Sequence, residues 1–346
     1  MGGGTPSSSN ESFWQGTIPW VSSSDIVEND IKNISISRYI TEEAIAHSAT
    51  KLCPAPSILI VSRVGVGKIA LSKEAICTSQ DFCNLVNIKV EPIFLTYCLS
   101  QIMKRKSMEV QGTSIKGITT SEIQKISINI PSLREQKKIG KILSLLDERI
   151  ATQHKIIEDL KKLKSAISHI LFSSKCAIHL SDIANVVMGQ SPSSNAYNDQ
   201  GIGMPLVQGN LDISNGKTTP RLYTAEFNQT AEEGNIILTV RAPVGEVAKA
   251  TKKVCLGRGV CAIIPHEENM SDFIYQYLTF YKFMWRRYEQ GSTFTSINGS
   301  DVRNIPCPKV RNVSILTLLD RKINIEERVI KLYQSQKQYM LCQMFI

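Results

Sequence analysis

Two short motifs contain residue types that could support catalysis, but neither has the spacing that the chemistry requires. Gly65-Val66-Gly67-Lys68 combines glycines with a lysine, yet it does not have the spacing of a phosphate-binding P-loop. Asn304-Ile305-Pro306-Cys307 is not the Asn/Asp-Pro-Pro-aromatic motif of amino-methyltransferases. No glycine-rich nucleotide loop follows an expected strand. We therefore predict no catalytic residue in this chain, and any reaction must belong to a partner.

The histidines and cysteines do not have the spacing of a metal site. Zinc needs closely spaced Cys or His ligands. The five histidines are spread over the chain at His47, His154, His169, His179 and His266. Cys77 with Cys83 and Cys255 with Cys261 recur six residues apart, which would put each pair on one face of a strand. We expect these cysteines to be small buried hydrophobic residues and predict no metal site.

The element that organises the chain is a long helix expected over residues 131–172. After Pro131 this stretch contains no proline and only one glycine, Gly140. Its apolar residues recur at the heptad spacing of a coiled-coil seam. The seam positions are Ile139, Leu143, Leu146, Ile150, Gln153, Ile157, Leu160, Lys164, Ile167 and Leu171. At 1.5 Å per residue, residues 135–172 would extend over roughly 55 Å, so this helix needs a partner along its length.

The same pattern returns at the end of the chain. Residues 145–150 (LLDERI) align with residues 318–323 (LLDRKI). This alignment places the second seam on Leu316, Leu319, Ile323, Glu326, Ile330, Tyr333, Lys337, Met340 and Met344. The polar interruptions coincide, because Gln153 aligns with Glu326 and Lys164 with Lys337. Two unrelated long helices are the alternative, but the matched interruptions favour a duplication.

Composition and charge favour a polyanionic partner and argue against a secreted or membrane-spanning protein. The 346 residues carry a formal net charge of +9 with a pI near 9.0, which favours a polyanionic partner. The nine cysteines are scattered without a CxxC pair, and the N-terminus has no apolar core of a signal peptide, so we expect a cytoplasmic protein. No apolar run approaches the length of a membrane span.

The duplication extends through the segments that precede each long helix. Residues 3–8 (GGTPSS) match residues 189–194 (GQSPSS), and residues 62–70 match residues 240–248. Asp25 corresponds to Asp212 in the same order. Further matches join residues 19–21 with 205–207, and residues 111–114 (QGTS) with 290–293 (QGST). The chain therefore reads as two copies of one unit.

Each copy is expected to be a mixed α/β (α+β) globule followed by a long helix. Buried strands are predicted over residues 58–60 and 236–240, and a half-buried strand is predicted over residues 123–131, where apolar and polar residues alternate. Helices are predicted over residues 92–106 and 271–287. The domain boundaries would be residues 1–131 and 176–308 for the globules, with residues 132–175 and 309–346 for the helices.

These features resemble the specificity (S) subunit of type I restriction-modification systems. The resemblance is carried by the openings GGTPS and GQSPS, by residues 111–150, by their echo in residues 290–308 and 314–323, and by the globule-helix-globule-helix order. It covers nearly the whole chain. The run from Leu133-Arg134-Glu135-Gln136 into residues 145–147 is its most specific part.

The resemblance implies two target-recognition domains, each reading one half of a split double-stranded DNA site. The two long helices would pair as an antiparallel coiled coil, which acts as a spacer and as the docking surface for methyltransferase (M) subunits. Restriction (R) subunits would join through the complex. AdoMet, ATP and Mg would be held by these partner subunits, so this chain would need no cofactor and would not be an enzyme.

DNA contacts within this resemblance are expected from polar and basic side chains in loops, which bind phosphates and base edges. The candidates are Arg63, Lys68, Gln111, Thr113 and Lys116 in the first domain and Arg241, Arg258, Gln290 and Thr293 in the second. A solvated surface charge is the alternative for each basic residue, and a structural turn is the alternative for the recurring Gln-Gly-Thr/Ser loop. Residues that read bases should differ between the copies.

Helix pairing and partner docking are expected to use apolar seam residues. These are Leu143, Leu146, Ile150, Ile157 and Leu160 on the first helix and Leu319, Ile323, Ile330 and Tyr333 on the second. The second copy lacks the Pro-x-x-x-Glu-Gln start of the helix, so docking need not be strictly twofold. The aromatic and basic residues 275–288 could stack on unpaired bases, but we favour the core face of a helix with Lys282, Arg286 and Arg287 outside.

Two alternatives to a working specificity subunit remain. The second domain is preceded by residues 176–190, whereas the first begins almost directly at Gly2-Gly3-Gly4, so an element equivalent to residues 180–187 is expected to be missing. The chain could therefore be a truncated or silent cassette that acts only as a stand-alone DNA-binding or interaction protein. It could also be a nuclease or methyltransferase with unrecognised motifs, which purified protein that cuts or modifies DNA would establish.

Overall fold

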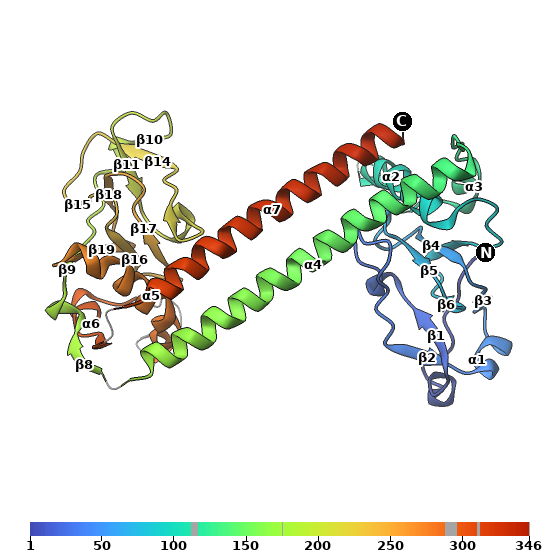
Figure 1. Ribbon diagram of the computed structural model, residues 1–346, viewed down its shortest axis with the longest axis horizontal. Coiled ribbons are helices and arrows are strands. Elements are labelled where there is room, and N and C mark those ends of the chain that lie inside the picture. The colour runs from blue at the N-terminus through green and yellow to red at the C-terminus, as the bar shows by residue number, and fades with distance from the viewer. Residues whose placement is uncertain (112–116, 175, 288–295, 310–311, 346) are drawn as a thin grey trace. The chain divides into compact units, whose positions relative to one another are not determined.

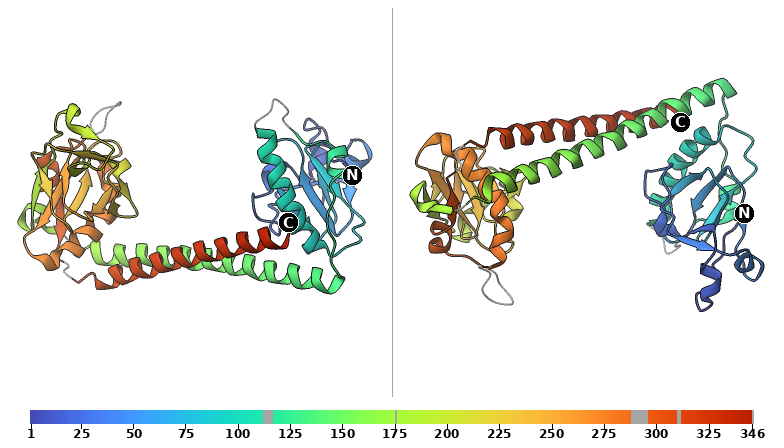
Figure 2. Two further views of the ribbon diagram at one scale, coloured as in Figure 1. Left: turned by 90° about the horizontal axis from the view of Figure 1, so that it is seen from above. Right: turned by 60° about the horizontal axis from the view of Figure 1, so that its bottom comes forward.

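The computed structural model describes all residues except 112–116, 175, 288–295, 310–311 and 346. The chain divides into two compact units, Met1–His154 with Arg328–Ile346 (unit 1) and Lys155–Glu327 (unit 2). Each unit contains one mixed α/β globule and parts of the two long helices (Figure 1, Figure 2). None of the helices in the described part of the chain is both long and apolar enough to cross a bilayer.

The described strands of unit 1 form two small sheets. Its strands are β1 Ile18–Val21, β2 Arg38–Ile40, β3 Leu52–Cys53, β4 Ser57–Val61, β5 Ile69–Ser72, β6 Ile76–Thr78 and β7 Phe82–Leu85. They form sheets of order β2-β1-β6-β3 and β5-β4-β7. The helices are α1 Glu42–Ala46, α2 Pro92–Gln111 and α3 Thr120–Gln124, followed by α4 Leu133–Phe172. The 3-10 turns are η1 Glu11–Trp14 and η2 Ser23–Asp25.

In unit 2, the residues that the structure describes form three sheets. Its strands are β8 Cys176–His179, β9 Ala184–Met188, β10 Tyr197–Asn198, β11 Met204–Val207, β12 Ile213–Ser214, β13 Lys217–Thr218, β14 Leu222–Thr224, β15 Thr230–Ala231, β16 Ile236–Thr239, β17 Val247–Lys249, β18 Val254–Leu256, β19 Val260–Pro265 and β20 Pro306–Pro308. The helices are α5 Ser271–Tyr281, α6 Gly299–Arg303 and α7 Ser314–Met344. The 3-10 turns are η3 Leu180–Asp182, η4 Ser194–Ala196, η5 Asn210–Asp212, η6 Glu268–Met270 and η7 Lys282–Arg287.

The two units share a common set of seven strands, as the internal repeat predicts, and unit 2 has further strands. The order β2-β1-β6-β3 in unit 1 corresponds to β14-β11-β18-β15 in unit 2, and β5-β4-β7 corresponds to β17-β16-β19. Each unit has one matching parallel pair, with Trp20 opposite Cys77 and Leu206 opposite Cys255. The predicted strands over residues 58–60 and 236–240 are β4 and β16, which are buried along their whole length.

The strand predicted over residues 123–131 does not form. Ile123 belongs to the short helix α3, and residues 126–132 have no regular structure. In unit 2 the corresponding residues form β20, which pairs with β8. No described strand of unit 1 takes the place of β8, so the backbone of residues 126–130 has no ladder partner. Ile126 and Ile128 instead pack against the core of unit 1.

The cysteine prediction was right about burial but wrong about placement. Cys77 lies on β6 and Cys83 on β7, and Cys255 and Cys261 lie on β18 and β19, so neither pair shares a strand. A turn between the two strands accounts for the six-residue spacing. All four thiols are buried. Burial raises the pKa of Cys77 and of Cys261 to about 12, which keeps both thiols protonated.

The helix predicted over residues 271–287 ends as an α-helix at Tyr281 and continues as the 3-10 turn η7. Tyr277, Tyr281 and Trp285 are buried, and consecutive rings of this series are in contact. These rings therefore belong to the core of unit 2, as favoured from the sequence. Lys282 lies outside and pairs with Glu246, whereas the side chains of residues 286 and 287 lie outside the described part.

The two long helices run close to their predicted bounds. α4 begins at Leu133, where Ser132 and Glu135 form reciprocal capping hydrogen bonds, and it continues without a break to Phe172. Every predicted seam position on α4 and α7 is buried or half-buried. Leu143 and Leu316 are completely buried, each within its own unit. The heptad pattern therefore marks the faces that these helices bury.

Candidate nucleic-acid interface

Unit 2 has a polar cleft where the loops after β11, β16 and β18 meet. Because β11 and β18 are parallel, their C-terminal ends lie at the same edge of the sheet. The cleft encloses about 350 Å³ and is lined by Ser191, Gln208, Gly209, Asn210, Leu211, Asp212, Arg221, Arg241, Ala242, Arg258 and Gly259. Most of these residues are hydrogen-bonding or basic, as a surface for an anionic, hydrogen-bonding ligand requires.

Three arginines line this cleft. Arg241 and Arg258, both predicted as DNA contacts, lie on different loops and are exposed. Arg221 completes the group and was missed by the sequence analysis. Among the described residues, Arg241 and Arg258 form no ion pair, whereas Arg221 pairs with Asp212. A planar guanidinium suits phosphates and guanine edges.

Asp212 holds the loop that follows β11. This aspartate is only 2% exposed. It accepts hydrogen bonds from the backbone nitrogen of Gln208 at 2.8 Å and from Nε of Arg221 at 3.0 Å. A buried carboxylate needs such compensation. The pair therefore fixes the loop and keeps the remaining guanidinium nitrogens of Arg221 beside the cleft.

Unit 1 repeats this arrangement around Asp25. Its carboxylate accepts from the backbone nitrogen of Ser22 at 2.7 Å and pairs with Arg38. Burial alone would raise the pKa of Asp25, but the hydrogen bonds from Ser22 and Arg38 outweigh burial and lower this pKa. Arg38 also lies over the ring of Trp20, 4.5 Å from its centroid. The sequence analysis missed Arg38 as well.

The spacing explains why these arginines were missed. Arg38 follows Asp25 by thirteen residues, whereas Arg221 follows Asp212 by nine. A comparison at constant spacing therefore does not align the arginines. The signal that could have found them is the start of a matched strand, because β2 begins at Arg38 and β14 begins one residue after Arg221.

Of the DNA contacts predicted in unit 1, Lys68 touches the loop that Asp25 holds. Arg63 is exposed in the turn after β4, at the position that matches Arg241. Nζ of Lys68 donates to the carbonyl oxygen of Ser23 at 3.1 Å, so this lysine stabilises the loop. Gln111 is the last residue of α2, and its side chain lies outside the described part. Thr113, Lys116, Gln290 and Thr293 also lie outside the described residues.

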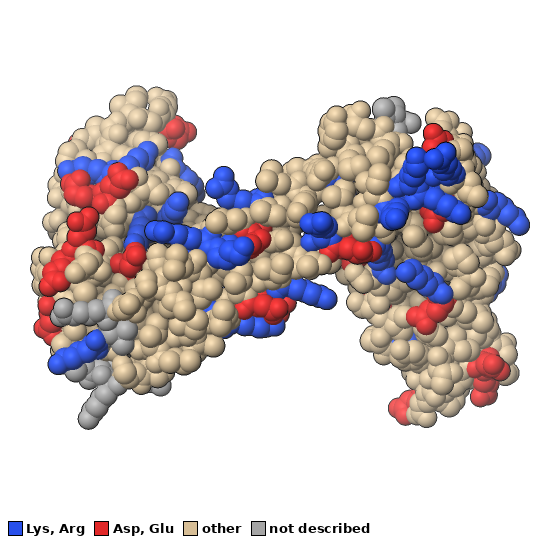
Figure 3. Space-filling view, viewed as in Figure 1, with Lys and Arg blue, Asp and Glu red and all other residues tan. Residues whose placement is uncertain are grey.

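Basic side chains also occupy the first turns of α4. Arg134, Lys137, Lys138 and Lys141 are exposed on this helix. Figure 3 shows lysine and arginine side chains gathered over this part of unit 1. Such a distribution attracts polyanions over a longer range than individual contacts do.

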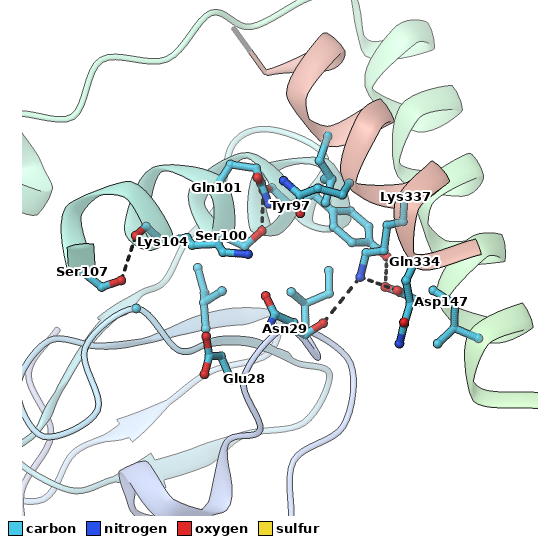
Figure 4. Close-up of a pocket in the computed structure, with 16 residues that line it drawn as sticks. Glu28, Asn29, Tyr97, Ser100, Gln101, Lys104, Ser107, Asp147, Gln334 and Lys337 are labelled. Carbon is cyan, nitrogen blue, oxygen red and sulfur yellow. Dashed lines mark hydrogen bonds and ion pairs between the residues drawn. The ribbon is translucent and has the colours of Figure 1, made fainter. Parts of the chain in front are cut away.

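Polar groups bind the long helices within each unit. In unit 1, Lys337 of α7 pairs with Asp147 of α4, and the hydroxyl of Tyr97 donates to the same carboxylate at 2.5 Å (Figure 4). Burial, followed by the hydrogen bond to Asp147, raises the pKa of Tyr97. In unit 2, Lys164 pairs with Asp320 at 2.6 Å, and Gln276 donates to the same carboxylate.

The predicted helix-pairing residues face inward. Leu143, Ile157, Ile323 and Ile330 are buried, and Leu146, Ile150, Leu160, Leu319 and Tyr333 are half-buried. A second apolar stripe on each helix is exposed. It consists of Ile142, Leu145, Ile156, Leu163 and Ile170 on α4 and of Ile315, Leu318, Ile325, Leu332 and Tyr339 on α7. These exposed apolar side chains are candidates for contacts with other proteins.

Comparison with known proteins identifies the family. Residues 1–162 and 177–332 match the family described as the type I restriction modification DNA specificity domain. The chain belongs to this family, and it contains two copies of the domain.

Curated relatives agree with this family. The putative type I restriction enzyme MjaX specificity subunit of Methanocaldococcus jannaschii is 31% identical over 245 residues, which are 64% of this chain and 58% of that protein. The EcoR124I/EcoR124II specificity subunit of Escherichia coli is 36% identical over 156 residues, which are 42% of this chain and 38% of that protein. The chain thus matches less than two thirds of the length of either relative.

Solved structures share the fold. The type I restriction-modification S subunit of M. genitalium superimposes with a TM-score of 0.64 at 19% identity, covering 100% of this chain and 93% of that one. A chain from a structure of type I R-M complex assembly and conformational transition has a TM-score of 0.63 at 22% identity, covering 95% and 92%. The expected mixed helix and strand fold is therefore confirmed.

Proposed function

We propose that this chain is the DNA sequence-specificity subunit of a cytoplasmic type I restriction-modification complex. Each globule reads one half of a bipartite site in double-stranded DNA, and residues 1–131 and 176–308 are the two target-recognition domains. The observation that carries this proposal is the polar cleft of unit 2, whose Asp–Arg-held loop is repeated in unit 1. Membership of the specificity-domain family supports it.

Phosphate contacts would position the domains on DNA, and contacts with base edges would provide sequence specificity. Arg63 and Arg241 occupy matching turns after β4 and β16, and a shared arginine suits the shared ligand, which is the phosphate backbone. The formal net charge of +9 favours such an electrostatic contribution. The proposed interface therefore combines a common basic frame with loops of different sequence.

The long helices would pair as an antiparallel coiled coil that sets the gap between the half-sites. Three ion pairs support this direction, because the residue number on α7 falls as that on α4 rises. They are Asp147 with Lys337, Lys161 with Glu327, and Lys164 with Asp320. A 40-residue helix extends over about 60 Å, which is long compared with the roughly 34 Å of one DNA turn.

Catalysis would come from M and R subunits that bring AdoMet, ATP and Mg. The exposed apolar stripes on α4 and α7 are the proposed docking surface for M subunits. Residues at heptad spacing on a helix form one continuous face, and such faces bind helices of a partner. The stripes match at Ile142 with Ile315 and at Leu145 with Leu318 but differ further along, so the two M contacts would differ in detail.

A genome-wide map of methylated adenines in the source cell, with and without this gene, tests the proposal. We expect deletion to remove one split motif with a fixed gap. Exchange of residues 1–131 for a homologous domain should then change one half of the motif and leave the other half intact. An unchanged map after deletion would overturn the proposed function and favour a stand-alone binding or interaction protein.

A further inference from the structure

The loop after β11 and its counterpart after β1 are held in the same way. In unit 2, the carboxylate of Asp212 binds the backbone nitrogen of Gln208 and the side chain of Arg221, which holds residues 208–212. In unit 1, the carboxylate of Asp25 binds the backbone nitrogen of Ser22 and the side chain of Arg38, which holds residues 22–25. We name these segments the loop 208–212 and the loop 22–25. The matched contacts show that the shared Asp–Arg pair shapes each loop and leaves the other side chains free to vary.

The backbone beside the two loops is also the same. Ser79 donates to the carbonyl oxygen of Val21 at 2.9 Å in unit 1, and Gly257 donates to that of Val207 at 2.8 Å in unit 2. These bonds place residue 80 beside the loop 22–25 and residue 258 beside the loop 208–212. The two loops therefore stand at the same place beside matching strands, and they differ in side chains and by one residue in length.

The side chains on this frame differ between the units. Gln208 stands where unit 1 has Ser22, Arg258 stands where it has Gln80, and Asn210 with Leu211 replaces Ser24 in a loop that is one residue longer. Asn210 and Arg258 are exposed and Gln208 is half-buried, and all three line the cleft. The variable positions thus coincide with the positions that a ligand could reach.

These three side chains suit base edges in the major groove. Arginine forms two hydrogen bonds with O6 and N7 of guanine, and asparagine or glutamine forms two with N6 and N7 of adenine. By contrast, Arg241 has a matching arginine, Arg63, in the other unit. A residue that both domains share does not distinguish their half-sites, so Arg241 suits a phosphate.

We propose that Gln208, Asn210 and Arg258 determine the bases read by the second domain. Asp212 and Arg221 are positioning residues that hold the loop 208–212, and Arg241 contacts phosphate. This inference rests on the proposed function. It assigns the base specificity of unit 2 to side chains of one cleft. Ser22, Ser24 and Gln80 are the corresponding residues of the first domain.

The test uses the methylation map of source cells that carry single-residue alleles of the full-length gene. Asn210→Ser, Gln208→Ser and Arg258→Gln introduce unit 1 residues into the unit 2 cleft. We expect each allele to change the preference at one or two positions of a single half-site by about tenfold or more, because one bidentate contact is lost. The other half-site should remain unchanged. Gln80→Arg in unit 1 should alter only the opposite half.

Two further alleles separate reading from positioning. Arg241→Gln should reduce methylation of all sites without changing the preferred bases. Asp212→Asn should broaden the preference across the same half-site that Asn210→Ser changes. Immunoblots of the full-length chain correct each map for protein amount, and Arg258→Lys and Asn210→Asp replace any allele that lowers this amount.

The outcomes distinguish the inference from the function on which it rests. If all three cleft alleles keep the wild-type motif, or reduce methylation equally at every site, the inference is overturned although the chain remains a specificity subunit. If deletion of the gene leaves every motif in place, the proposed function itself fails. A changed preference confined to one half-site supports both.

Discussion

Asp147 and Lys337 form an ion pair that recurs, with the helices exchanged, as Asp320 and Lys164. In unit 1 the aspartate lies on α4 and the lysine on α7, and in unit 2 the aspartate lies on α7 and the lysine on α4. Both lysines interrupt an apolar seam at the same heptad position. Polar pairs at seam positions would set the register of the proposed helix pairing, because any shift would leave a half-buried charge unpaired.

The Asp147–Lys337 pair should contribute more to stability than an exposed pair. The two side chains are only 17% and 14% exposed, so Lys337→Ala should lower the free energy of unfolding by about 3 kcal/mol. Lys161→Ala removes an exposed partner of Glu327 and should cost less than about 1 kcal/mol. Urea unfolding of both variants measures the difference. Equal losses would show that the less exposed Asp147–Lys337 pair has no special role.

Two neighbouring isoleucines separate helix packing from docking. Ile157 is 8% exposed and Ile156 is 40% exposed. Ile157→Ala should lower the free energy of unfolding by about 2–4 kcal/mol, because it leaves a cavity. Ile156→Glu should change stability by less than about 0.5 kcal/mol, yet it should prevent copurification with the M subunit. Thermal unfolding and copurification are measured on the same preparations. Normal M binding by Ile156→Glu would exclude this stripe as the docking surface.

Acidification should remove the contribution of the Asp25–Arg38 pair to the free energy of unfolding. Hydrogen bonds from Ser22 and Arg38 lower the pKa of Asp25 despite the opposing effect of burial. A carboxyl with a lowered folded-state pKa stabilises the fold above its unfolded pKa, and this stabilisation is lost as pH falls through the folded pKa. The stability difference between the natural chain and Asp25→Asn should therefore be full at pH 7 and shrink below about pH 4.

Urea unfolding as a function of pH measures this effect. Ser22→Ala removes one hydrogen-bond donor to the carboxylate, so its difference from the natural chain should decrease over the same acidic range. A difference that stays constant down to pH 3 would contradict the assigned cause.

Gly245 should tolerate no side chain. Its φ is +89°, and an added Cβ would lie 2.2 Å from Cδ1 of the buried Trp285. Gly245→Ala should therefore lower the free energy of unfolding by more than about 3 kcal/mol, since overpacking adds to the backbone strain. Gly234 is the matched control, because its φ is +84° with no atom within 4 Å of the added Cβ. Gly234→Ala should cost only about 1–2 kcal/mol in thermal unfolding.

The sequence by itself determined the long helices, the repeat and the burial of the seams. A heptad stripe depends on residues three and four apart, which a helix brings to one face whatever the rest of the chain does. The repeat was equally visible, because Asp25 and Asp212 kept their order relative to neighbouring motifs. The spacing of apolar residues and the order of the repeated motifs can both be read from the sequence alone.

Only the tertiary structure decided which distant residues share a cleft. Arg38 and Arg221 became functional candidates because strand pairing brings them to Asp25 and Asp212 across unequal spacings. Residues 126–130 failed to form their predicted strand because a strand needs a neighbour, and β8 exists as that neighbour only in unit 2 among the described strands. These outcomes depend on hydrogen bonds between segments far apart in the chain, which local residue patterns do not specify.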